Sequence, residues 1–186
     1  MTEPKPPDIR RIVEAFDRRG VEYLLVGGIA ATAHGAERLT GDADAVVRRT
    51  TENLEATAAV LRDLNAHLLV EGLSDDEARE LPVLIDALTL SRMEISTWRT
   101  DAGDLDVLVE IPSQDGSRLS YDALLPRAVD APYGADHIVV HIAALEDIIA
   151  SKQWANRPKD HDALPELLRL RDTNRQSEEE PPTLSE

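Results

Sequence analysis

The chain has 186 residues, contains no cysteine and carries a formal net charge of −16. The lack of cysteine excludes disulfide bonds and cysteine-based zinc sites, and the apolar run over residues 23–33 is shorter than the ~20 residues that span a bilayer. We therefore expect a cytoplasmic protein without membrane contact, built as one domain or as a core with a helical appendage.

The N-terminal part predicts a flexible arm followed by an amphipathic helix. Residues 1–7 are proline-rich, Asp8 can cap a helix that ends at Arg19, and Gly20 can stop it. Positive charge is clustered in three arginine pairs, at residues 10–11, 18–19 and 48–49. Because the overall charge is acidic, these pairs allow local contact with RNA or form a solvated face, and a basic protein partner is equally compatible.

The next stretch carries the strongest signal. It begins with an apolar strand over residues 23–26, followed by Gly27 and Gly28, where the backbone can turn sharply and leave N–H groups uncovered. A short helix over residues 29–34 then starts on this turn. Such a helix N-terminus attracts phosphate through its free N–H groups and the helix dipole.

Two acidic residues follow on the next predicted strand, residues 42–47. Because side chains alternate along a strand, Asp42 and Asp44 share one face, while Ala43 points to the other. Neighbouring carboxylates repel each other and gain most from a hard divalent cation such as Mg²⁺ or Mn²⁺. A phosphate-binding turn followed by such a pair suggests a nucleoside triphosphate (NTP) substrate and phosphoryl-group chemistry.

The middle of the chain predicts a helix over residues 51–63 and a β-hairpin made of residues 93–100 and 104–111. On the second strand of this hairpin, Asp104 and Asp106 share one face. An acid beside mid-strand apolar residues is costly to bury unless it is paired or bound to a metal. Either residue can therefore belong to a site, or face water close to the turn.

The C-terminal third predicts a strand over residues 138–142 and a helix over residues 143–154. A last helix is expected to end near Leu170, and the acidic residues 174–186 are expected to be disordered. Lys152 lies in a chain whose positive charge comes almost wholly from arginine. A lysine in such a chain suggests that a compact charge is needed, for example beside a phosphate.

Two segments together resemble the nucleotidyltransferase superfamily. The first, VGGIAATAHGAERLTGDAD, has the superfamily order of a glycine turn followed by Asp-x-Asp on the next strand. Finer features, similar to the AbiEii-like and MenT-like toxin nucleotidyltransferases of toxin–antitoxin systems, are His34-Gly35 and Arg38-Leu39-Thr40. The second segment resembles the family's downstream motif through Ser151-Lys152, Arg157, Lys159 and Asp160.

The resemblance implies an α/β (α+β) nucleotidyltransferase fold, in which a mixed sheet is flanked by helices and followed by a C-terminal helical segment. It divides the chain into a core of residues 8–120 and a segment of residues 121–173, a strand and helices that complete the site. The implied catalytic residues are Asp42, Asp44, Asp106 and Lys152, the three aspartates being the metal ligands, with Asp104 as the rival of Asp106. The implied nucleotide-binding residues are Gly27, Gly28, Thr40, Lys152 and Arg157.

The implied activity is the Mg²⁺- or Mn²⁺-dependent transfer of a nucleoside monophosphate from an NTP such as ATP to the 3′ end of tRNA. Such a toxin would block aminoacylation until an antitoxin protein neutralises it. Gly28 replaces the more usual serine, and Gly41 and Ala43 are smaller than the residues usual around the aspartate pair, so nucleotide geometry can differ. Alternatives are nucleotidylation of a protein hydroxyl or a small molecule, and a degenerate nucleotidyltransferase that serves as a binding module.

Overall fold

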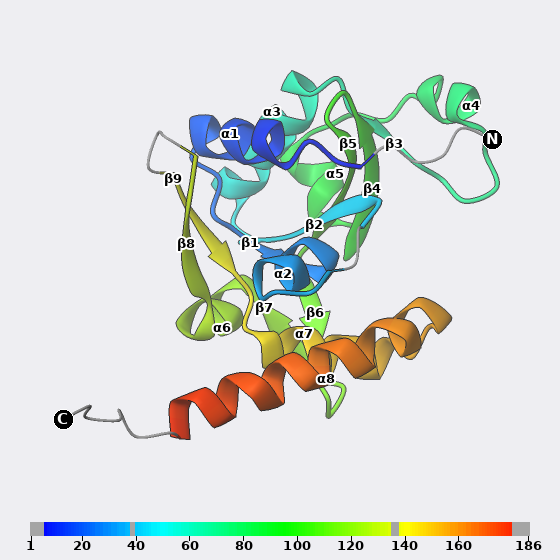
Figure 1. The fold of residues 1–186 in the computed structure, drawn as a ribbon. Helices are drawn as coiled ribbons and strands as arrows, with labels where there is room; N and C mark the ends of the chain where they lie inside the picture. The colour runs from blue at the N-terminus through cyan, green and yellow to red at the C-terminus, as the bar shows by residue number, and fades with distance from the viewer. Residues whose placement is uncertain (1–5, 38–39, 135–137, 180–186) are drawn as a thin grey trace.

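The computed structural model describes residues 6–37, 40–134 and 138–179 of the chain. Its centre is a seven-stranded mixed sheet with the strand order β3-β4-β5-β2-β1-β9-β8 (Figure 1). Strands β2 and β5, and strands β1 and β9, run parallel, whereas the other pairs in this sheet are antiparallel. The strands are β1 (Tyr23–Val26), β2 (Asp42–Val47), β3 (His67–Leu68), β4 (Ile95–Thr100), β5 (Gly103–Leu108), β8 (Val129–Tyr133) and β9 (Ile138–Ile142).

Helices flank this sheet, and a small second sheet pairs β6 (Glu110–Pro112) with β7 (Arg118–Ser120). Helices α1 and α3 pack together on one side, while α2 contacts β1, β2 and α7, and α7 packs along α8 (Figure 1). The predicted mixed sheet with flanking helices and a C-terminal helical segment is therefore confirmed. The helices are α1 (Ile9–Arg19), α2 (Gly27–Ala33), α3 (Thr51–Asp63), α4 (Asp75–Arg79), α5 (Ala87–Ser91), α6 (Tyr121–Leu124) with the 3-10 turn η1 (Leu125–Arg127), α7 (Leu145–Ala155) and α8 (Pro158–Glu179).

Helix α1 illustrates how local sequence sets an element. The Asp8 carboxylate accepts a hydrogen bond from the backbone N–H of Arg11 at 3.1 Å, and Gly20 ends the helix in a left-handed conformation. One face, which includes Ile12 and Phe16, is fully buried in the core. The helix predicted from Asp8 to Arg19 is confirmed, because its cap, its stop and its apolar face are all encoded within a few residues.

Side chains alternate between the two faces of the sheet along β2 and β5, so apolar and acidic residues point to opposite faces. Ala43 and Leu105 are fully buried on one face, and they are opposite each other in the register of the two parallel strands. The acidic residues therefore lie on the other face, where Asp44 is opposite Asp106. This register brings together two acids that are more than sixty positions apart in the sequence.

Three sequence-based expectations about elements are wrong. The strand predicted over residues 104–111 is broken at Val109, where the chain leaves the large sheet and begins the second one. The region of residues 121–173 contributes two strands, β8 and β9, rather than one. Helix α8 does not end near Leu170 but continues to Glu179, so residues 174–179 are helical instead of disordered.

Some expectations fall on residues outside the described ranges. These are residues 1–5 of the predicted arm, Arg38 and Leu39 of the family motif, and residues 180–186 of the tail. Within the described part of the arm, Pro7 lies so close to Gly103 that a β-carbon built there would be 2.8 Å from the Pro7 Cα. Among the described residues, no helix has both the length and the apolar character needed to cross a membrane.

Candidate active site

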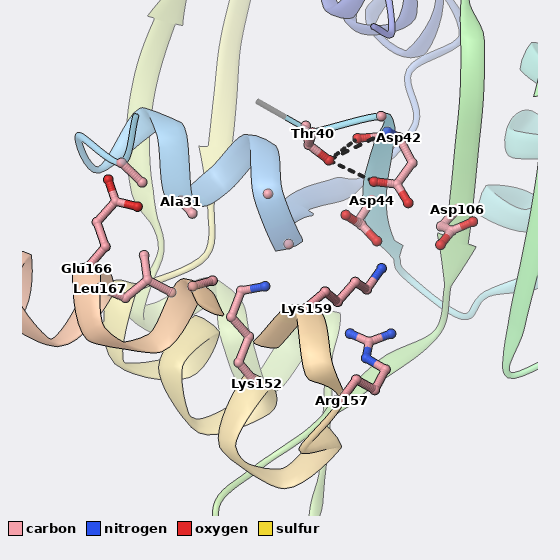
Figure 2. A pocket seen from close by; sticks show the side chains of 15 residues that line it. Ala31, Thr40, Asp42, Asp44, Asp106, Lys152, Arg157, Lys159, Glu166 and Leu167 are labelled. Atoms are coloured by element: carbon pink, nitrogen blue, oxygen red, sulfur yellow. Dashed lines mark hydrogen bonds between the residues drawn. The ribbon is translucent and has the colours of Figure 1, made fainter. Parts of the chain in front are cut away.

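A cavity of about 290 Å³ lies between the start of β2, the start of α2 and the start of α8 (Figure 2). It collects side chains from elements that are distant in the sequence. The lining includes all eight residues that the sequence predicts for the site: Gly27, Gly28, Thr40, Asp42, Asp44, Asp106, Lys152 and Arg157.

The choice between Asp104 and Asp106 is made by their partners. The Asp104 carboxylate pairs with the Arg99 guanidinium through two hydrogen bonds, at 2.9 and 3.0 Å, and it does not line the cavity. Asp106 lines the cavity beside Asp44, its partner in the strand register. The structure thus brings Asp42, Asp44 and Asp106 to one site and leaves Asp104 in a separate ion pair.

Two of the clustered carboxylates, those of Asp44 and Asp106, have a raised pKa. Burial is the main cause that raises the pKa of Asp44 from 3.8 to about 7, and the charges of Asp42 and Asp106 raise it further. Burial also raises the pKa of Asp106, although a hydrogen bond from Thr97 opposes this effect. Among the described residues, none gives a hydrogen bond to the buried Oδ1 atom of Asp106. A cation that binds beside these carboxylates therefore lowers the free energy of the site.

The glycine turn approaches the carboxylates closely. Gly27 has a φ of +62°, and a β-carbon built on it would lie 2.0 Å from Asp44 Oδ2, so only glycine fits without displacement. A β-carbon on Gly28 would lie 2.8 Å from Thr40 Oγ1. The Thr40 hydroxyl in turn donates a hydrogen bond to Asp42 Oδ1 at 2.7 Å. Helix α2 starts at Gly27 itself, two residues earlier than predicted, so both glycines belong to its first turn.

A second charged group faces the carboxylates from α7 and α8. Asp160 is fully buried in the first turn of α8 and accepts from Arg157 Nε at 2.7 Å and from Lys152 Nζ at 3.3 Å. Burial alone would raise the pKa of Asp160, but these two cations outweigh it and hold the pKa below its usual range. Asp160 thus fixes Lys152 and Arg157 at the edge of the cavity, with the Arg157 guanidinium directed toward the aspartates (Figure 2).

Lys159 is the site residue to which sequence analysis gave no role. Its side chain lines the cavity and points toward Asp44 and Asp106 (Figure 2), and its charge lowers the pKa of both. The available signal was its position between Arg157 and Asp160. Further residues on the same face of α8, recurring at helical spacing, also line the cavity: Ala163, Glu166 and Leu167.

Comparison with known proteins rests on the fold. The sequence matches no protein-family model, and no curated protein matches it. Solved structures do match it. One is the structure of the lincosamide antibiotic adenylyltransferase LnuA bound to lincomycin, which matches at a TM-score of 0.57 and 14% sequence identity. The match covers 88% of this chain and 96% of LnuA. The chain has the nucleotidyltransferase fold.

Two structures of the antibiotic-resistance factor ANT(2'')-Ia show the same nucleotidyltransferase fold. The solution structure matches at a TM-score of 0.54 and 19% identity, covering 91% of this chain and 83% of that one. The crystal structure in complex with adenylyl-2''-tobramycin matches at a TM-score of 0.53 and 19% identity, covering 91% and 88%. At these identities the match establishes the fold and does not transfer a substrate.

The nucleotidyltransferase fold implies a divalent metal, and the donor set suits one in part. Among the described residues, no three acidic or histidine side chains form a ready-made metal centre. Yet Asp106 offers an unpaired buried oxygen, and the pKa of Asp44 is raised by burial and further by the negative charges of Asp42 and Asp106. Mg²⁺ is usually held by one or two carboxylates together with substrate phosphates and water, not by an all-protein cage. The residues therefore fit a metal that arrives with the nucleotide.

Proposed function

We propose that this protein transfers a nucleoside monophosphate from an NTP to an acceptor hydroxyl with the help of Mg²⁺ or Mn²⁺. The observation that carries this proposal is the meeting of three aspartates, a glycine turn without side chains and three cations in one cavity. Opposite charges arranged around a space of this size suit a metal-bound triphosphate, whose phosphates need both a cation and uncovered backbone N–H groups.

Each part of the cavity has a distinct role in this proposal. Gly27 and Gly28 let the backbone approach the outer phosphates, and Asp42, Asp44 and Asp106 would hold the metal. A bound divalent ion would neutralise phosphate charge and lower the pKa of the acceptor hydroxyl.

Lys152, Lys159 and Arg157 face the side on which pyrophosphate charge develops. Asp106 would serve the attacking hydroxyl either by holding the metal or, as the alternative role, by accepting the proton of that hydroxyl.

For the acceptor we propose the 3′ end of tRNA, which would make the protein a toxin that requires an antitoxin partner. Support comes from the motif residues shared with the toxin nucleotidyltransferases. Four of the described ones, Thr40, Lys152, Arg157 and Lys159, line a single cavity.

A small hydroxylated compound is the second candidate acceptor, and the surface charges favour it. Most arginines of the three clusters are already paired with acids: Arg10 with Glu14, Arg11 with Asp101, Arg19 with Asp63, and Arg48 with Glu22 and Asp122. These arginines are therefore poorly placed to hold RNA phosphates. Proteins of the same fold act on small antibiotics, as the names of the two solved neighbours state.

The test is transfer of label from an α-labelled NTP, with tRNA, cell protein and small hydroxyl compounds in separate reactions. Wild-type protein is expected to label one acceptor class, and Asp42→Ala is expected to label none while remaining folded by circular dichroism. Asp104→Ala is the matched control, because it removes an aspartate of the same sheet face outside the cavity. Labelling by Asp42→Ala at the wild-type rate would show that the site is wrong. Sequencing of tRNA 3′ ends after expression then decides between the acceptors.

A further inference from the structure

A second hollow, of about 320 Å³, opens on the other side of the catalytic carboxylates. It shares Gly27, Asp44, Asp106, Lys152 and Arg157 with the nucleotide cavity, and its remaining walls are its own. These walls come from β4, the β6–β7 sheet and α7, and their apolar residues are Ile95, Ile111, Pro112, Ile148 and Trp154. A space of this size accommodates one ring-sized group rather than an extended polymer.

Trp154 gives this hollow a flat wall. Its residue surface is 52% exposed, whereas the other tryptophan, Trp98, is fully buried. The turn between β6 and β7 fixes the indole: Gly116 has a φ of +83°, and a β-carbon built there would lie 2.6 Å from Trp154 Cη2. An exposed tryptophan held by neighbouring backbone is a pre-ordered surface for a planar or apolar ligand face.

Glu110 supplies a polar anchor in the same hollow. Its carboxylate lies 3.6 Å from Arg118 Nε, and Arg118 Nη2 lies 3.8 Å from Glu94. Both distances exceed hydrogen-bond length, so the carboxylate oxygens of Glu110 remain able to accept from a ligand N–H. The hollow is lined by three carboxylates, of Asp44, Asp106 and Glu110, and by three cations, of Arg118, Lys152 and Arg157, so its charges balance. Glu110 therefore selects a ligand group through its need for an N–H donor.

We propose that this hollow is the acceptor subsite, and that it takes a hydroxylated compound with a flat apolar face and an amino group. This inference rests on the proposed nucleotidyl transfer. The flat face would stack on Trp154, the amino group would donate to Glu110, and the hydroxyl would reach Asp106, where the two cavities meet. The hydroxyl oxygen then bonds to the α-phosphorus, the bond to pyrophosphate breaks with its electron pair on the leaving group, and the hydroxyl proton is released to solvent water.

An amino-bearing nucleoside at an RNA end and a free amino alcohol share this chemistry. Acrylamide quenching of tryptophan fluorescence tests binding, because Trp98 is buried and Trp154 is accessible. With the nucleotide cavity filled by Mg²⁺ and α,β-methylene-ATP, we expect adenosine to reduce quenching by about twofold, and inosine, which lacks the amino group, to bind roughly tenfold more weakly. Glu110→Gln should remove this preference. The proposal would be overturned if adenosine and inosine protect Trp154 from quenching equally. It would also be overturned if neither nucleoside nor 2-phenylglycinol protects Trp154.

Kinetics distinguish this inference from the proposed function. For the acceptor that wild-type protein labels, Trp154→Ala should raise KM for that acceptor about tenfold and leave KM for the NTP within about twofold. Trp154→Phe keeps an aromatic face and should stay within about threefold of wild type. Leu84→Ala, an exposed apolar residue outside the hollow, is the matched control. Unchanged acceptor KM in Trp154→Ala would refute the subsite while the transferase stands.

Two versions of the labelling assay show whether the acceptor is an RNA end or a free amino alcohol. Labelling of intact tRNA that is lost after periodate oxidation of its terminal diol identifies the RNA end, and labelling of 2-phenylglycinol identifies a free amino alcohol. Failure of wild-type protein to bind Mg²⁺–NTP in calorimetry would instead remove the proposed function, and ligand protection of Trp154 would still report on the hollow.

Discussion

Replacing Asp44 by asparagine should stabilise the folded protein at neutral and alkaline pH. Asp44 is packed against Gly27 and repelled by Asp42 and Asp106, and its pKa is raised from 3.8 to about 7. The unfolded chain loses this proton near the lower value, whereas the folded protein keeps it until the higher one. The stability that the proton provides is therefore lost as the pH rises through about 7.

The magnitude follows from the same two values. At 1.36 kcal/mol for each pH unit, the difference between 3.8 and about 7 corresponds to at most about 4 kcal/mol. Asp44 lines a cavity that is open to solvent, and screening there reduces the expected effect to about 2 to 4 kcal/mol. Asp44→Asn, which mimics the protonated side chain, should exceed wild type by roughly 1 kcal/mol at about pH 5 and by the full amount at about pH 8.

Urea unfolding at both pH values, followed by circular dichroism, measures this difference. Asp104→Asn is the matched control because Asp104 is paired with Arg99, and its loss should destabilise by about 1 kcal/mol. Mg²⁺–NTP should stabilise wild type but not Asp44→Asn. If Asp44→Asn is no more stable than wild type at alkaline pH, or if the gap does not widen with pH, the carboxylates are not under electrostatic stress and the reasoning fails.

Three further substitutions test the cavity. Gly27→Ala places a methyl group 2.0 Å from Asp44 Oδ2 at a φ of +62°, so we expect a loss of about 1 to 2 kcal/mol in urea unfolding and roughly tenfold weaker Mg²⁺–NTP binding by calorimetry. Lys159→Ala removes a charge that lowers the pKa of Asp44, so metal–nucleotide binding in a pH series should require higher pH. Asp160→Asn leaves Arg157 without its buried partner and should cost about 2 to 3 kcal/mol in thermal unfolding.

Each of these has an outcome that contradicts it. An unchanged nucleotide affinity in Gly27→Ala would mean that the turn does not approach the phosphates. A pH series for Lys159→Ala that coincides with wild type would separate this lysine from the carboxylates. Wild-type stability in Asp160→Asn would show that the ion pairs of Asp160 with Lys152 and Arg157 do not stabilise the fold.

The parts of the fold that the sequence predicts are those encoded locally. Short local stretches of sequence encode the strand, the glycine turn and the second strand around Gly27. The cap and the stop of α1 are encoded locally as well. Helix α8 was predicted too short because its last turns are polar. Its Arg175 nevertheless lies 3.6 Å from Glu146 of α7, a contact that a single-element pattern cannot contain.

The site was predictable where a motif names its residues and unpredictable where packing decides. The separation of Asp104 from Asp106 depends on Arg99, which the antiparallel register of β4 and β5 places opposite Asp104. The hollow beside Trp154 depends on the break at Val109, which turns the chain into a second sheet. Neither feature follows from residue spacing, because each needs strands that are paired in space.

The charged residues that line the cavity are synthesised at different times. Its three clustered aspartates are translated by residue 106, whereas the described cations that face them come from residues 152–159, which leave the ribosome later. Chain growth at about 5 to 20 residues per second separates the two groups by a few seconds. A nascent chain thus carries only the mutually repelling carboxylates of the proposed site, and the proposed binding of a triphosphate would begin when the final helix emerges and docks.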